Sequence, residues 1–60
     1  MERVIYDFGA ARVVSIYPHT LRVEKMERGQ WKRCADFDTM SDDYAHSNAR
    51  DYAARLAPAK

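Results

Sequence analysis

The sequence predicts an α+β fold, in which an antiparallel sheet of three to four strands is followed by one C-terminal helix that packs on one face. Alternating apolar and polar residues, rich in β-branched and aromatic types, occupy the first two thirds of the chain. Alanines at helical spacing occupy the last third. With 60 residues, the chain has the length of a single domain, 1–60.

Four segments within residues 3–37 have the composition of strands. Gly9 favours a turn after the first, because glycine adopts positive φ without steric cost. Pro18 interrupts the chain after the second, because proline has no N–H to donate to a sheet. Gly29 favours a tight turn between the last two, which form the clearest hairpin. The segments are 3–8, 12–17, 21–26 and 31–37.

A helix is expected over residues 41–57. Thr39 or Ser41 can serve as its N-cap, and the spacing of Thr39 and Asp42 resembles a capping box. Asp42 and Asp43 then fall in the first turn, where the helix dipole favours negative charge, and Pro58 ends the helix. The side chains expected to face the sheet are Ala45, Ala49, Tyr52, Ala53 and Leu56.

One helix can cover only one face of a sheet, yet the first two strands are apolar on both faces. Strict alternation places Ile5, Val14 and Ile16 on the uncovered face. Exposed apolar patches mark protein contacts, so these three side chains are predicted to bind a partner or a second copy of the chain. The alternative is that a neighbouring loop or the twist of the sheet hides them.

Charge is segregated along the chain, although the formal net charge is only +1. The segment from 36 to 51 contains five aspartates and a single arginine. Such a surface can meet a Lys/Arg-rich groove on another protein, while the alternative is that the aspartates serve only turns and caps. The predicted acidic partner-binding residues are Asp36, Asp38, Asp42 and Asp43.

The preceding hairpin is basic, and this gives a second possible function. Cationic side chains could contact phosphates while an aromatic ring stacks on a base. The near-neutral net charge, with Glu24 and Glu27 inside the hairpin, makes nucleic acid the second choice. The residues of this DNA-binding alternative are Arg22, Lys25, Arg28, Trp31 and Lys32.

The chain offers no set of residues that catalysis requires. Asp42 and His46 lie one helical turn apart, but two ligands do not make a metal site. Cys34 cannot form an internal disulfide, and a lone strand cysteine more often packs as a small apolar residue than reacts. We therefore expect no enzyme, cofactor or metal. No apolar run has the length of a membrane span, so the expected location is the cytoplasm.

The stretch Gly29-Gln30-Trp31 … Phe37-Asp38-Thr39, followed by an alanine-rich helix, resembles small phage and bacterial domains. It is similar to the arm-binding domains of tyrosine-type phage integrases in sheet and helix order. In size and in lacking catalytic residues, the chain is also similar to phage inhibitors of bacterial defence, anti-CRISPR proteins among them. The resemblance implies a small phage-type binding module that blocks a host protein in the host cytoplasm, with a homodimer as one possible form.

Overall fold

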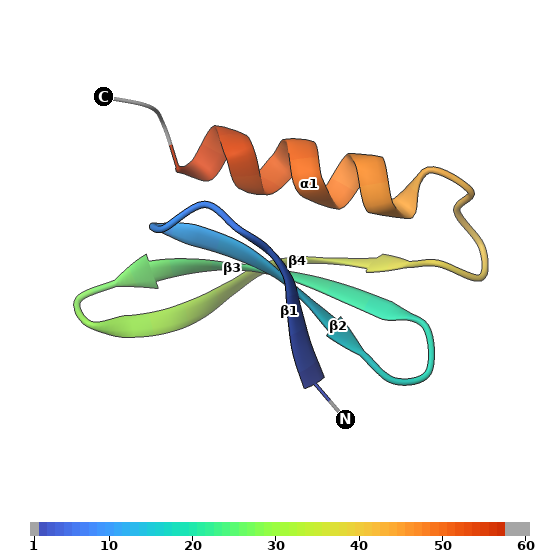
Figure 1. The fold of residues 1–60 in the computed structure, drawn as a ribbon, viewed down its shortest axis with the longest axis horizontal. Coiled ribbons are helices and arrows are strands. Elements are labelled where there is room, and N and C mark those ends of the chain that lie inside the picture. The colour runs from blue at the N-terminus through green and yellow to red at the C-terminus, as the bar shows by residue number, and fades with distance from the viewer. Residues whose placement is uncertain (1, 58–60) are drawn as a thin grey trace.

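Four strands precede one helix in the computed structural model, which describes residues 2–57. The elements are β1 (Glu2–Asp7), β2 (Ala11–Ile16), β3 (Thr20–Glu27), β4 (Gln30–Asp38) and α1 (Ala45–Leu56). The strands form an antiparallel sheet in the order β1-β2-β3-β4, and α1 packs against β2, β3 and β4 (Figure 1). The predicted α+β class is confirmed. The predicted helix stop at Pro58 lies outside the described residues.

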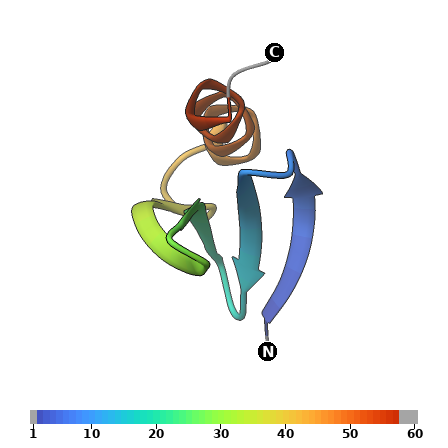
Figure 2. The same ribbon diagram turned by 90° about the vertical axis from the view of Figure 1, so that its left-hand side faces the viewer.

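The core lies between α1 and the sheet face that α1 covers (Figure 2). Ala45, Ala49 and Ala53 are buried and recur at every fourth position, as the sequence predicts. Their small side chains allow the helix backbone to approach the sheet closely. The Tyr52 and Phe37 rings pack in a T-shaped arrangement with their centroids 6.1 Å apart. The sheet contributes the buried side chains Ala11, Val13, Leu21 and Val23.

The helix begins later than predicted. Its N-cap residue is Tyr44, which makes no side-chain cap, and its first turn holds no acidic residue. The capping prediction for Thr39 and Ser41 is wrong, because β4 extends to Asp38 and the Thr39 hydroxyl donates instead to the His19 carbonyl at 3.1 Å. The Asp42 carboxylate organises the approach to the helix by accepting the Tyr44 N–H at 2.9 Å.

A β-bulge in β1 changes which of its side chains face the helix. Val4 lies opposite Val14, whereas Tyr6 lies opposite Val13, so Ile5 is an extra residue in this strand. Ile5 packs against the core on the covered side. The prediction that Ile5 lies on the uncovered face is therefore wrong.

A second bulge, at Cys34 in β4, has the same effect. Ala35 lies opposite the buried Val23, but Arg33 lies opposite Glu24. Strict alternation places Trp31, Arg33, Ala35 and Phe37 on one face. The bulge instead turns the first two away from α1 and leaves the last two packed against the core.

The face turned away from α1, which we call the open face, is not the exposed apolar patch that the sequence predicts. Val14 is only 3% exposed, because it lies between two cross-strand neighbours, Val4 and Arg22. Ile16 is half-buried, and Val4, at 43% exposure, takes the place predicted for Ile5. The strong twist, visible where β1 runs across the direction of β4 in Figure 1, helps to close this face.

Candidate functional site

Charged side chains on the open face neutralise one another. Arg12 Nε lies 2.7 Å from Glu24 Oε1, and Arg22 Nη1 lies 3.5 Å from Glu24 Oε2. Glu24 is only 7% exposed, and the Arg12 guanidinium also lies over the Trp31 ring, 4.0 Å from its centroid. These contacts hold β2, β3 and β4 together, and they use the side chains that a ligand would need.

The structure does not gather the five residues of the DNA-binding alternative into one accessible strip. Arg22 and Trp31 are engaged in the open-face contacts just described. Lys32 Nζ lies 3.3 Å from Glu27 Oε1, and Lys25 lies directly opposite Lys32 in the sheet. Only Arg28, in the β3–β4 turn, is exposed with no acidic partner among residues 2–57.

Two loops meet at the opposite end of the molecule, to the right in Figure 1. One is the β2–β3 turn, 17–19, and the other connects β4 to α1, 39–44. The Thr39 N–H donates to the His19 carbonyl at 2.8 Å, and His19 Nδ1 lies 3.0 Å from Asp38 Oδ1. We call residues 17–19 and 38–44 the loop end.

The loop end presents large apolar side chains to solvent. Tyr17, Met40 and Tyr44 are 78%, 75% and 72% exposed, the highest values among the large apolar residues described. These three residues are not among the binding residues predicted from the sequence. Their position beside Pro18, Ser41 and paired aspartates, outside every strand and helix, was the available signal, because side chains there have no sheet or helix face to bury against.

Three of the four predicted acidic residues come together at the loop end: Asp38, Asp42 and Asp43. Asp42 is fixed by the Tyr44 N–H and by the Asn48 side-chain amide, which donates at 3.1 Å. Asp36 is placed elsewhere, on the open face, 3.4 Å from Arg33 Nη1. The loop end therefore combines exposed aromatic surface with negative charge.

Hydrogen bonding to Asp38 stabilises its charged form. The Met40 N–H donates to its carboxylate at 2.8 Å and, together with the charge and hydrogen bond of His19, holds the pKa of Asp38 below its ordinary value of 3.8, against an opposing effect of desolvation. Because the folded-state pKa is the lower one, this carboxylate contributes stability above the ordinary pKa and loses it as the pH falls through the lowered value.

Asp38→Asn should therefore lower the melting temperature at pH 7 and have a smaller effect at pH 2, because the wild-type carboxylate gains protons as the pH falls through its lowered pKa. Asp43→Asn is the matched control, because the exposed Asp43 side chain accepts no hydrogen bond from any residue between 2 and 57, and no difference is expected at either pH. Thermal unfolding followed by circular dichroism at the two pH values measures both effects. An equal decrease in melting temperature in Asp38→Asn at pH 2 and pH 7 would contradict this role of the Asp38 charge.

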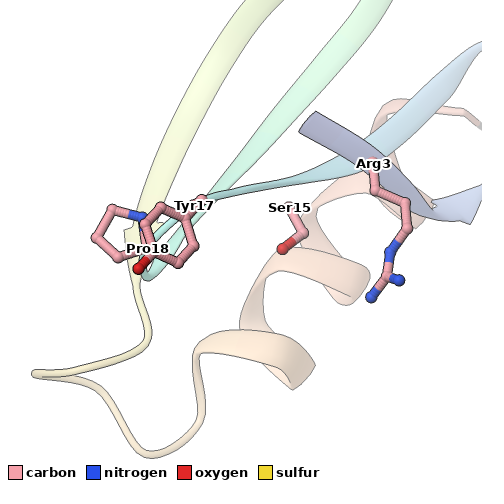
Figure 3. Close-up of a pocket in the computed structure, with 4 residues that line it drawn as sticks. All are labelled: Arg3, Ser15, Tyr17 and Pro18. Carbon is pink, nitrogen blue, oxygen red and sulfur yellow. The ribbon is translucent and has the colours of Figure 1, made fainter. Parts of the chain in front are cut away.

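A hollow of about 220 Å³ adjoins the loop end. Figure 3 shows its four lining residues, Arg3 from β1, Ser15 from β2, and Tyr17 and Pro18 from the following turn. Arg3 and Ser15 lie directly opposite each other in the sheet. The hollow thus combines a guanidinium, a hydroxyl and two ring-bearing side chains.

Groups that could carry chemistry are dispersed. Within residues 2–57 no three His, Cys, Asp or Glu side chains cluster as metal ligands would. Cys34 is exposed at the β4 bulge, with its Sγ 3.7 Å from the Lys32 carbonyl oxygen. His46 is exposed on α1, and Asp42 accepts from Asn48. The described helix is not long and apolar enough to cross a membrane.

Comparison with family models, curated proteins and solved structures finds no match to this chain.

Proposed function

We propose that the chain is a non-enzymatic protein-binding module that uses its loop end to occupy a basic surface of a partner protein. The observation that supports this is the exposure of Tyr17, Met40 and Tyr44 on two loops that hydrogen-bond to each other. Tyrosine and methionine are enriched in protein interfaces, because each brings a large contact area with few groups to desolvate.

The surrounding charge supports a basic partner surface. Asp38, Asp42 and Asp43 favour a surface rich in lysine and arginine, which they would orient and attract during encounter. The hydrogen bonds of His19, Thr39 and the aspartates fix the loops before binding, and this reduces the entropy lost on association.

The phage-type resemblance in the sequence favours a host protein in the cytoplasm, such as a component of bacterial defence, which the module would block by covering its surface. A second copy of the chain is the other occupant to test. The sheet gives this homodimer less support than the sequence suggests, because Val14 is buried and Ile5 belongs to the core.

A photo-crosslinking amino acid placed at Met40 tests the proposal inside the cell of origin. Met26 is the matched control position, because it is also exposed and lies near the end of β3 that is remote from the loop end. We expect one discrete adduct from position 40 and none from position 26. The adduct should disappear when Asp38, Asp42 and Asp43 are all replaced by asparagine, because the charge that favours the basic partner is then removed.

Mass spectrometry of the adduct identifies the occupant. A partner protein with a lysine- and arginine-rich contact peptide supports the proposal. A crosslinked dimer of the chain overturns the proposal that the partner is a different protein. An adduct that forms equally from position 26 overturns the proposal that the loop end is the binding surface.

A further inference from the structure

The hollow beside the loop end is lined by an arginine, Arg3, whose charge no carboxylate among the described residues neutralises. Arg12, Arg22 and Arg33 on the open face each have a carboxylate within 4.0 Å. Arg3 has none among residues 2–57, and it lines the hollow together with Ser15, its cross-strand neighbour (Figure 3). An arginine placed at the wall of a hollow without an internal partner is available to an anionic ligand.

We infer that this hollow binds a carboxylate group carried by the partner, an inference that rests on the proposed function. The N–H groups of a guanidinium form a planar fork that matches the two oxygens of a carboxylate, and the Ser15 hydroxyl can donate a further hydrogen bond. Tyr17 and Pro18 supply apolar ring faces on which the carbon atoms next to that carboxylate can pack.

In a partner protein, as proposed above, the anionic side chains are carboxylates, and this favours a carboxylate over a phosphate as the ligand of the hollow. Asp38, Asp42 and Asp43 lie on the loop end, which shares Tyr17 and Pro18 with the hollow. The preferred partner segment therefore places one carboxylate in the hollow and basic side chains against the three aspartates.

Titration of the folded protein with sodium benzoate, followed by ¹H–¹⁵N NMR, tests the inference directly. Benzamide is the neutral probe of the same shape, and phenyl phosphate is the phosphate probe. We expect benzoate to produce saturable shifts at the Arg3 Nε–H and the Ser15 amide, and benzamide to produce none there. Arg3→Gln should weaken benzoate binding about tenfold, because a charge-assisted hydrogen-bond pair is lost.

Arg55→Gln is the matched control, since Arg55 is an exposed arginine at the far end of α1. It should leave benzoate binding unchanged. Equal shifts with benzoate and benzamide, or unchanged binding in Arg3→Gln, would overturn the inference. Tighter binding of phenyl phosphate than of benzoate would overturn the choice of a carboxylate.

The two proposals can fail separately. Replacing Asp38, Asp42 and Asp43 together by asparagine should remove the Met40 crosslink to the partner. The same variant should leave benzoate binding intact or strengthen it, because nearby negative charge is removed. Loss of benzoate binding with an intact crosslink refutes only the claim that the hollow binds a carboxylate. An absent crosslink with intact benzoate binding refutes only the loop end as a protein-binding surface.

Discussion

Replacing Ala49 with leucine should destabilise the domain by about 2–3 kcal/mol, as expected when a larger side chain is forced into a packed core. Ala49 is fully buried at the middle of α1, between Ala45 and Ala53 and against the sheet. Three added carbon atoms must push the helix away from β2 and β3 or adopt strained rotamers. A domain of this size is stable by only about 3–5 kcal/mol, so a large fraction of the variant should be unfolded.

Ala54→Leu is the control, because Ala54 is exposed on the same helix and leucine is nearly as good a helix former as alanine. Urea unfolding of both variants, followed by circular dichroism, gives the two free energies. If Ala49→Leu and Ala54→Leu are equally stable, the close approach of the helix to the sheet is not as described.

Replacing Glu24 with alanine should also cost about 2–3 kcal/mol. Removing one partner of a fully buried ion pair costs about 3–5 kcal/mol, because the remaining charge is left without compensation. We reduce this figure because the Arg12 side chain is 26% exposed and can regain some hydration. Arg22 would lose its contact with Glu24 in the same variant.

Glu27→Ala is the matched control on the same strand, since the Glu27–Lys32 pair is exposed and such pairs contribute about 0–1 kcal/mol. Urea unfolding compares the two. If Glu24→Ala lowers the free energy of unfolding no more than Glu27→Ala does, the open-face contacts do not stabilise the sheet. Intrinsic fluorescence of Trp31 provides a second readout, because the Arg12 guanidinium should leave the ring when its carboxylate partner is removed.

The fold class could be predicted from the sequence because its signals are local. Period-2 alternation, the glycines at the turns and the alanines spaced by four each depend on neighbouring residues alone. The start of the helix could not be predicted in this way. The Thr39 hydroxyl donates a hydrogen bond to the His19 carbonyl, and only the sheet topology brings this residue, 20 positions away, close to Thr39.

The faces of β1 and β4 were mispredicted for one physical reason. A bulge adds one residue and shifts the alternation of every side chain beyond it. Neither Ile5 nor Cys34 is a glycine or follows a proline, so no residue type marks either bulge. The bulge in β1 moves Ile5 out of the predicted apolar patch and puts Val4 in its place, and the cross-strand neighbours of Val14 bury that side chain.

The candidate site was predicted in part. Clustering of acids is visible in sequence, so Asp38, Asp42 and Asp43 could be proposed from it. That these aspartates lie at the same end of the molecule as Tyr17 could not be predicted. It requires the β2–β3 turn and the β4–α1 loop to hydrogen-bond to each other. The neutralisation of Arg22 by Asp36 and of Lys32 by Glu27 likewise depends on cross-strand register.

Charge reversal at the loop end tests most directly whether this surface binds the partner. The measurement is the dissociation constant of the partner identified through Met40, determined by calorimetry for Asp43→Lys and Asp51→Lys. Both aspartates are exposed, but Asp51 lies on α1, beside Arg50. Our account predicts a dissociation constant about tenfold higher for Asp43→Lys and little change for Asp51→Lys. Equal effects of the two variants, or an unchanged value for Asp43→Lys, would contradict it.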